Sequence, residues 1–200
     1  MIKFINLSKS KPHQLLKKFY ENALEKKQES IEVMAVSSYD SALNTVDSRF
    51  VNAKYVNDED LIFFSNYDGP KSKQFSSNNR VSVLFYWNKI DTQIRISGKI
   101  KKTNPSFSNE HFKKRDKKKN ALAISSSQSK EISSYAAIKK QYEKVLNSKK
   151  IDLYKRPDYW GGYSIKPYKF EFWQGNSARL NIRNVYFIKD HEWQNFILEP

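Results

Sequence analysis

Residues 92–102 read TQIRISGKIKK, and this stretch is the clearest guide to the fold. Its isoleucines, at positions 94, 96 and 100, fall on one face, and polar side chains fall on the other. Strict alternation of this kind predicts a β-strand with one buried face. Gly98 interrupts the apolar face, so we expect a bulge or a close approach of another backbone there.

The segments on either side predict a mixture of strands and helices. Runs rich in β-branched and aromatic residues predict strands over 31–38, 48–56, 60–66, 80–87, 160–165, 168–174, 182–188 and 193–198. Apolar residues at helical spacing predict helices over 12–27, 105–119 and 133–147. In the last of these, an apolar stripe is expected to join the core; it consists of Tyr135, Ile138, Tyr142 and Val145. The order of helix, strands, helices and strands predicts an α+β domain with a mainly antiparallel sheet or barrel.

The composition limits the class of protein. The 200 residues suffice for one domain with a core, and 14% of them are aromatic, unlike a disordered chain. Cysteine is absent, which excludes disulfides and thiolate metal sites. No apolar run approaches the ~18 residues that a membrane span needs. The first residues are too polar for a secretory signal, so we expect a cytoplasmic protein without a membrane partner.

The net charge of +15 leaves three interpretations open. It could reflect a nucleic-acid partner, a cleft for an anionic small molecule, or a lysine bias spread along the chain. The densest block of charge is KKRDKKK at residues 113–119. This block fits a solvated helix end, a nucleic-acid patch or a lid that supplies cations to a phosphate.

The C-terminal part carries motifs that identify a family. The motifs are WGGY at 160–163, FEFWQG at 170–175 and RLNIR at 179–183. Together they resemble the W-G-G-[YF], I/F-E-F-W-Q-G and R-L-H-D-R signature of pyridoxamine 5'-phosphate oxidases. Four segments upstream also resemble the family: RFVNAK at 49–54, FFSN at 63–66, RVSVLFYW at 80–87 and QS at 128–129. The whole resemblance covers about residues 31 to 200.

The resemblance implies a split β-barrel with flanking helices that works as a homodimer, with FMN in clefts at the subunit interface. We therefore expect one FMN-binding domain over residues 1–200. Residues 1–30 would form an N-terminal arm and helix, and residues 155–200 the dimerisation and signature region.

The resemblance also assigns roles in cofactor binding. Arg49, Lys71 and Ser65 would hold the FMN phosphate, because arginine offers a planar fork of N–H donors and lysine a point charge. Gln93 would bind the edge of the isoalloxazine ring, and Gln128 and Ser129 would come from the partner subunit. The expected set is completed by Lys54, Phe64, Trp173 and Arg183. An arginine of the family just before Lys71 is Pro70 here, so one phosphate contact is missing.

The substrate side departs further from the family. Its substrate-binding tyrosine, arginine and serine correspond to His111, Arg115 and Lys119, and the histidine of R-L-H-D-R is Asn181. With Arg179 and Lys54, these residues form the expected substrate set. An R-x-x-Y segment that often precedes the first helix in the family has no match before Pro12.

These residues lead to three functional hypotheses. The first is a pyridoxamine/pyridoxine 5'-phosphate oxidase, which oxidises a C–N or C–O bond by hydride transfer to flavin N5, with O2 as the final acceptor, giving pyridoxal 5'-phosphate and H2O2. The second keeps the FMN dimer but changes the substrate, as in the flavin oxidases of phenazine biosynthesis. The third is a non-catalytic flavin- or nucleic-acid-binding split barrel. We place nucleic acid last, because no recognised nucleic-acid motif accompanies the charge.

Overall fold

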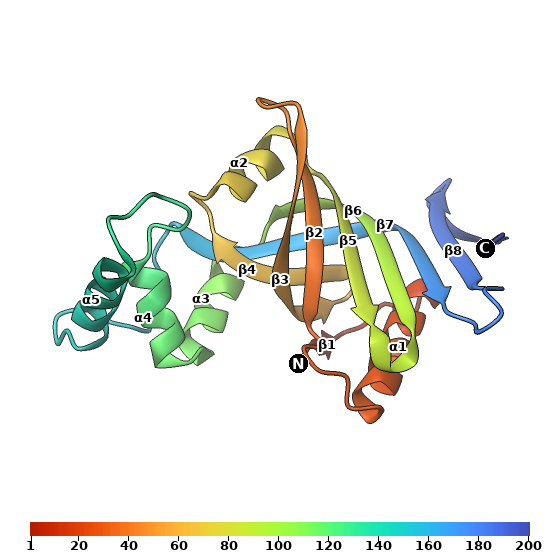
Figure 1. The fold of residues 1–200 in the computed structure, drawn as a ribbon, viewed down its shortest axis with the longest axis horizontal. Helices are drawn as coiled ribbons and strands as arrows, with labels where there is room; N and C mark the ends of the chain where they lie inside the picture. Colours follow the sequence, from red (N-terminus) through yellow and green to blue (C-terminus); the bar gives the residue numbers. More distant parts are fainter. The chain divides into compact units, whose positions relative to one another are not determined.

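The computed structural model describes residues 1–200 as two compact units, and Figure 1 labels helices α1–α5 and strands β1–β8. The first unit comprises Met1–Phe63, Gln74–Lys101 and Ser164–Pro200. The second comprises Phe64–Lys73 and Lys102–Tyr163. No helix is long and apolar enough to cross a membrane.

Nine strands build the sheet. They are β1 (Lys3–Ile5), β2 (Val33–Asp40), β3 (Thr45–Asn57), β4 (Asp60–Asn66), β5 (Arg80–Trp87), β6 (Thr92–Lys102), β7 (Trp160–Gln174), β8 (Ile182–Lys189) and β9 (Glu192–Leu198). The helices are α1 (Lys11–Glu25), α2 (Pro70–Ser77), α3 (Pro105–Lys114), α4 (Lys117–Ser125) and α5 (Tyr135–Leu146), with a short 3₁₀ helix at Asn88–Ile90.

The strand order closes into a ring. It runs β3–β2–β5–β6–β7, and β4 pairs with both β7 and β3. The pairs β2–β3, β2–β5, β3–β4 and β5–β6 are antiparallel. β8 and β9 extend the sheet beyond β7 as an antiparallel hairpin. The expected α+β architecture with an antiparallel split barrel is therefore confirmed.

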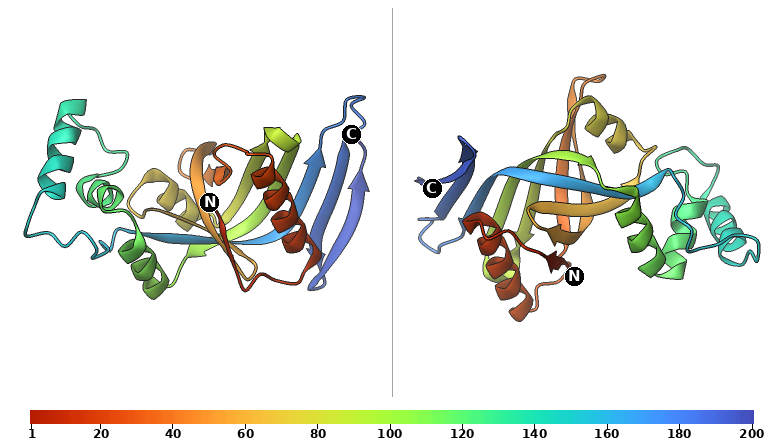
Figure 2. Two further views of the ribbon diagram at one scale, coloured as in Figure 1. Left: turned by 90° about the horizontal axis from the view of Figure 1, so that it is seen from below. Right: turned by 180° about the vertical axis from the view of Figure 1, so that it is seen from behind.

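Helix α1 lies against the sheet in the first unit (Figure 2), and aromatic side chains pack between them. Phe19 of α1 stacks on Phe172 of β7, with ring centroids 5.5 Å apart. His13 is 1% exposed and packs edge-on against Phe170 at 5.1 Å. Burial lowers the pKa of His13. Aromatic pairs of this kind stabilise a core beyond the area that they bury.

The strand predictions agree closely with the structure. β4, β5 and β6 have the predicted bounds, and Ile94, Ile96 and Ile100 are all buried. Gly98 marks a close backbone approach rather than a bulge, because the β5–β6 register is continuous through it. A Cβ atom at Gly98 would lie 2.5 Å from Ile165 Cγ2 and 2.9 Å from the Lys166 carbonyl oxygen.

The predicted helices and strands differ from the structure at several places. The helix expected over 105–119 is two helices, because Arg115 is extended and the Asp116 side chain caps α4 by accepting from the backbone N–H groups of Lys118 and Lys119. The strands expected over 160–165 and 168–174 are one continuous strand, β7. Helix α2 was not predicted, since eight residues give too few apolar repeats.

The apolar stripe of α5 is not core. No residue of α5 is buried, and Tyr135 is 82% exposed. Its tyrosines instead line a hollow of about 470 Å³ together with residues of α4. The expectation failed because periodicity predicts an apolar face but not whether another element covers it.

Candidate functional site

The predicted site residues are divided between the two units. The first unit holds Arg49, Lys54, Gln93, Trp173, Arg179, Asn181 and Arg183. The second holds Phe64, Ser65, Lys71, His111, Arg115, Lys119, Gln128 and Ser129.

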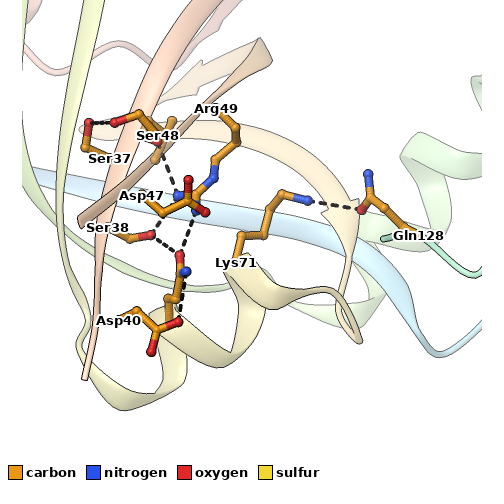
Figure 3. Close-up of polar contacts among 10 residues, drawn as sticks. Ser37, Ser38, Asp40, Asp47, Ser48, Arg49, Lys71 and Gln128 are labelled. Carbon is orange, nitrogen blue, oxygen red and sulfur yellow. Dashed lines mark hydrogen bonds and ion pairs between the residues drawn. The ribbon is translucent and has the colours of Figure 1, made fainter. Parts of the chain in front are cut away.

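The Arg49 side chain on β3 donates several hydrogen bonds to the groups around it (Figure 3). Its Nη1 donates to Ser38 Oγ at 2.6 Å and to the Val36 carbonyl oxygen at 3.3 Å. Its Nη2 donates to Gln74 Oε1 at 2.7 Å and to Asp47 Oδ2 at 2.5 Å. The guanidinium is therefore fixed by β2, by its own strand and by α2. We call Arg49 and these partners, with Asp40, the Arg49 cluster.

Two neutral side chains orient this guanidinium from the inside. Ser38 and Gln74 are only 2% and 4% exposed, and Ser38 Oγ donates to Gln74 Oε1 at 2.6 Å. Gln74 Nε2 donates to Asp40 Oδ2 at 3.2 Å, which fixes the orientation of the amide. Hydrogen bonds from the Leu43 backbone N–H and from Gln74 lower the pKa of Asp40.

Sequence reasoning missed the partners in this cluster. Antiparallel register places Val36 opposite Arg49 and Ser38 opposite Asp47. Arg49 and Asp47 are two positions apart on one strand, so alternation alone puts them on the same face. That signal was available for Asp47, whereas Gln74 lies on the unpredicted helix α2.

In the second unit, Lys71 and Ser65 converge on Gln128. Lys71 Nζ donates to Gln128 Oε1 at 3.1 Å, and Ser65 Oγ lies 3.5 Å from the same oxygen. Ser129, the next residue, adopts a left-handed backbone with φ of 66°. We expected Gln128 and Ser129 to serve the partner subunit, and within the single chain Gln128 contacts Lys71 of its own chain.

Aromatic rings and a cation form a stack in the second unit. Phe64 lies face to face with His111, with centroids 3.7 Å apart and planes 8° apart, and with Trp160 at 5.3 Å. The Arg115 guanidinium lies over the Trp160 ring at 5.1 Å, within cation–π range. Burial lowers the pKa of Arg115, and Asp116 opposes this effect. Three predicted residues, Phe64, His111 and Arg115, are thus brought together, and Trp160 is added to them.

Lys119 connects this stack to the hollow beside α5. Its carbonyl oxygen accepts from Arg115 Nη1 at 2.7 Å. Lys119 also lines the hollow, with Lys118, Leu122, Tyr135, Ile138, Lys139, Tyr142 and Glu143. The backbone of Lys119 therefore fixes Arg115, and the same residue borders the hollow beside α5.

The C-terminal signature contains a buried ion pair that the sequence did not reveal. Trp173 and Arg183 are paired in register on β7 and β8. Arg183 donates to Glu171 Oε1 through Nε at 2.9 Å and through Nη2 at 2.8 Å, and its Nη1 donates to the Glu199 carbonyl oxygen at 3.1 Å. Arg95 reaches the same carboxylate at 3.5 Å. We call Arg183, Glu171 and Arg95 the Arg183 cluster.

The remaining predicted residues lie at more open positions. Lys54 pairs with Glu32 at 3.4 Å, and Gln93 Oε1 accepts from Arg95 at 3.2 Å. Arg179 is exposed, with φ of 60°, in the turn between β7 and β8. Asn181 Oδ1 accepts from the Asn176 backbone N–H at 3.2 Å in the same turn. Of these residues, Gln93 contacts the Arg183 cluster through Arg95.

Comparisons with known proteins assign this chain to a family. Residues 20–149 match the family model described as pyridoxamine 5'-phosphate oxidase, and residues 160–200 match the pyridoxine 5'-phosphate oxidase C-terminal dimerisation region. Pyridoxine/pyridoxamine 5'-phosphate oxidase 1 of Hydrogenovibrio crunogenus is 36% identical over 183 residues, covering 90% of this chain and 84% of that protein. The corresponding oxidase of Colwellia psychrerythraea is 34% identical, covering 96% and 88%.

A solved structure agrees with this assignment. PhzG from Burkholderia lata, in complex with tetrahydrophenazine-1-carboxylic acid, superposes with a TM-score of 0.90 at 26% identity, covering 96% of this chain and 93% of that one. From these matches, the chain belongs to the pyridoxamine 5'-phosphate oxidase family of FMN-dependent oxidoreductases.

Proposed function

We propose that this chain oxidises pyridoxamine 5'-phosphate and pyridoxine 5'-phosphate to pyridoxal 5'-phosphate, with bound FMN as cofactor and O2 as acceptor. The observation that carries the proposal is the Arg49 guanidinium, held by the buried side chains of Ser38 and Gln74. A cation fixed in this way is suited to bind the phosphate of a cofactor. The relatives named above are oxidases of these two compounds.

The donor set of the chain fits FMN. Arg49, Lys71 and Ser65 supply a fork, a point charge and a hydroxyl, which are the groups that a phosphate ester needs. Gln93 and Trp173 would hold the isoalloxazine ring of FMN, and Lys54 would lie beside it. Gln128 and Ser129 would complete the FMN site of the partner subunit. When bound, FMN supplies the two-electron chemistry that connects substrate oxidation to O2.

The substrate would bind through the aromatic stack of the second unit. Arg115 would hold its phosphate, and His111 and Lys119 would replace the tyrosine and serine of the family as donors. Arg179 and Asn181 would approach its ring from the turn between β7 and β8. The residues of the chain would therefore bind and orient the substrate, and we assign none of them as a general base.

A second substrate class has specific support. His111, Lys119 and Asn181 all differ from the residues that the family uses for its vitamin substrate. PhzG, solved with a tetrahydrophenazine carboxylate, covers nearly the whole chain. Asn181 is neutral at every relevant pH, so it cannot reproduce the proton chemistry of histidine. A reduced aromatic carboxylate is thus the alternative substrate class.

We also propose that the protein is a cytoplasmic homodimer and that residues 1–200 act as one FMN-binding domain. The match to the dimerisation region supports the dimer. Exposed apolar side chains on β8 and β9 fit a subunit contact: Ile182 is 53% exposed, Phe196 41% and Ile197 75%. Light scattering with size-exclusion chromatography should give twice the mass of one chain, and a monomer at micromolar concentration would contradict the dimer.

The decisive experiment begins with the visible spectrum of the purified protein. A yellow protein, or FMN uptake by titration, is expected, and its absence would rule out the cofactor. Pyridoxine 5'-phosphate and pyridoxamine 5'-phosphate should then each give aldehyde and peroxide. FMN binding without turnover of either would favour the alternative substrate class. A steep salt dependence of DNA or RNA binding, without flavin, would favour the nucleic-acid hypothesis.

A variant sharpens the substrate assignment. Asn181→His should raise activity on the two vitamin phosphates, because it restores the histidine of the family motif. Asn181→Gln serves as the matched control, since it keeps a neutral amide. Unchanged or lower activity of the histidine variant would place Asn181 away from the substrate.

A further inference from the structure

The Arg49 guanidinium has few N–H donors left for a ligand. Arginine carries five N–H groups, one on Nε and two on each Nη. In this chain, all four Nη hydrogens have acceptors: Ser38 and the Val36 carbonyl for Nη1, and Gln74 and Asp47 for Nη2. A phosphate would therefore meet a fork whose donors are already engaged.

The four acceptors differ in how easily they can be removed. Ser38, Gln74 and Val36 are buried, and Ser38 is also hydrogen-bonded to Gln74. Asp47 is the exception, because its side chain is 54% exposed, whereas that of Arg49 is 16% exposed. Water can solvate a released Asp47 carboxylate, so its contact with Arg49 is the one that can open at low cost.

The net charge around Arg49 also disfavours phosphate binding while Asp47 stays in place. Arg49 is one cation, and Asp40 and Asp47 are two carboxylates, so these three groups sum to −1. Asp40 reaches the arginine only through Gln74, whereas Asp47 contacts Nη2 directly. A phosphate at Nη2 would meet the Asp47 carboxylate at hydrogen-bond distance, where like charges repel.

We propose that Asp47 is an internal competitor for the phosphate of the cofactor: its carboxylate occupies Nη2 of Arg49, and it must release this donor before the guanidinium can bind phosphate through a fork. Asp47 then sets the FMN affinity of this chain, and Ser38, Val36 and Gln74 keep the arginine in place while Asp47 leaves. This inference rests on the proposed function, in which Arg49 binds the FMN phosphate.

The test compares two flavins that differ only in the phosphate. Apoprotein is titrated into FMN and, separately, into riboflavin, and flavin fluorescence quenching gives each Kd. Asp47→Asn keeps the size of the side chain and removes its charge. We expect the variant to bind FMN about fivefold more tightly, since an ion pair of this exposure is worth up to ~1 kcal/mol. Riboflavin affinity should stay within about twofold, because riboflavin has no phosphate to compete.

A matched control separates the contact from net charge. Asp158→Asn also removes one carboxylate, but this side chain is fully exposed and lies 4.0 Å from Arg156. It should leave both affinities within about twofold of wild type. Asp47→Ser provides a second substitution with a short polar side chain, in case Asp47→Asn folds poorly.

The outcomes separate this inference from the proposed function. Wild-type protein that fails to bind FMN would refute the function, and the inference with it. Wild-type protein that binds FMN, together with an Asp47→Asn variant of equal or weaker affinity, would refute the inference alone; a weaker affinity would mean that Asp47 orients Arg49. Equal tightening for FMN and riboflavin would also refute it, because the effect would not involve the phosphate.

Discussion

The Arg49 and Arg183 clusters lie in the same unit and use an arginine in opposite ways. In the Arg183 cluster the carboxylate is inside, since the Glu171 side chain is 7% exposed and Arg183 is 25% exposed. In the Arg49 cluster the arginine is inside, 16% exposed, and its carboxylate partner Asp47 is outside at 54%. The inner partners of Arg49 are neutral, whereas Arg183 has a buried charge to neutralise.

This difference predicts that the two arginines contribute differently to the stability of the fold. Removal of Arg183 would leave the buried Glu171 carboxylate with only Arg95 at 3.5 Å. Removal of Arg49 would leave Ser38 and Gln74 hydrogen-bonded to each other, and Asp47 in water. A buried charge without a partner is far more costly than a neutral pair that stays satisfied. We therefore expect Arg183 to act mainly on stability and Arg49 mainly on binding.

The largest expected effect is on Arg183. Arg183→Ala should reduce the free energy of unfolding by about 3 kcal/mol, because it leaves the Glu171 carboxylate buried and poorly neutralised. Urea unfolding followed by fluorescence measures this loss. Glu171→Gln combined with Arg183→Ala should recover much of the stability, as a double-mutant cycle would show. A loss below about 1 kcal/mol for the single variant would remove the distinction between the clusters.

The second effect is on binding through Arg49. Arg49→Ala should weaken FMN binding by roughly 10- to 100-fold, since charge-assisted hydrogen bonds to a phosphate contribute about 1.5–3 kcal/mol. Its free energy of unfolding should fall by about 1 kcal/mol or less. Fluorescence titration and urea unfolding give the two numbers. Arg49→Lys is the control and should recover part of the affinity through its charge. A large stability loss with unchanged FMN affinity would reverse our assignment.

A third, smaller effect concerns the support of Arg49. Gln74→Leu should reduce the free energy of unfolding by about 1–2 kcal/mol, because the Ser38 hydroxyl and Arg49 Nη2 each lose an acceptor. FMN affinity should fall severalfold as the guanidinium loses its fixed orientation, and FMN titration checks this. Gln74→Asn keeps a neutral amide acceptor on a shorter side chain and should retain more FMN affinity than the leucine variant. Equal affinities in both variants would show that Gln74 does not orient Arg49.

The smallest effect is expected at Arg95. Its side chain is 48% exposed and its contact with Glu171 is 3.5 Å long. Arg95→Ala should therefore reduce the free energy of unfolding by about 0.5 kcal/mol or less. If urea unfolding instead gives a loss as large as that of Arg183→Ala, the two arginines share the neutralisation of Glu171 equally.

The sheet was more predictable than the helices. Alternation defined β4, β5 and β6 with their observed bounds, because a half-buried strand repeats every second residue. The break between α3 and α4 was missed, although Asp116 is a typical N-cap residue. The α5 stripe was wrongly placed in the core, since no local pattern states which face another element covers.

The sequence by itself determined the family, the strand pattern and the identity of the cations. Motifs at 49–54, 160–163 and 170–175 identify Arg49 and the signature strand without any coordinates. Only the tertiary structure decided which N–H groups of each arginine are engaged, and by what. The physical reason is that the donor and acceptor atoms of a hydrogen bond must lie about 3 Å apart. Strand register, which places Val36 beside Arg49, and the docking of α2, which brings Gln74 to it, decide those positions.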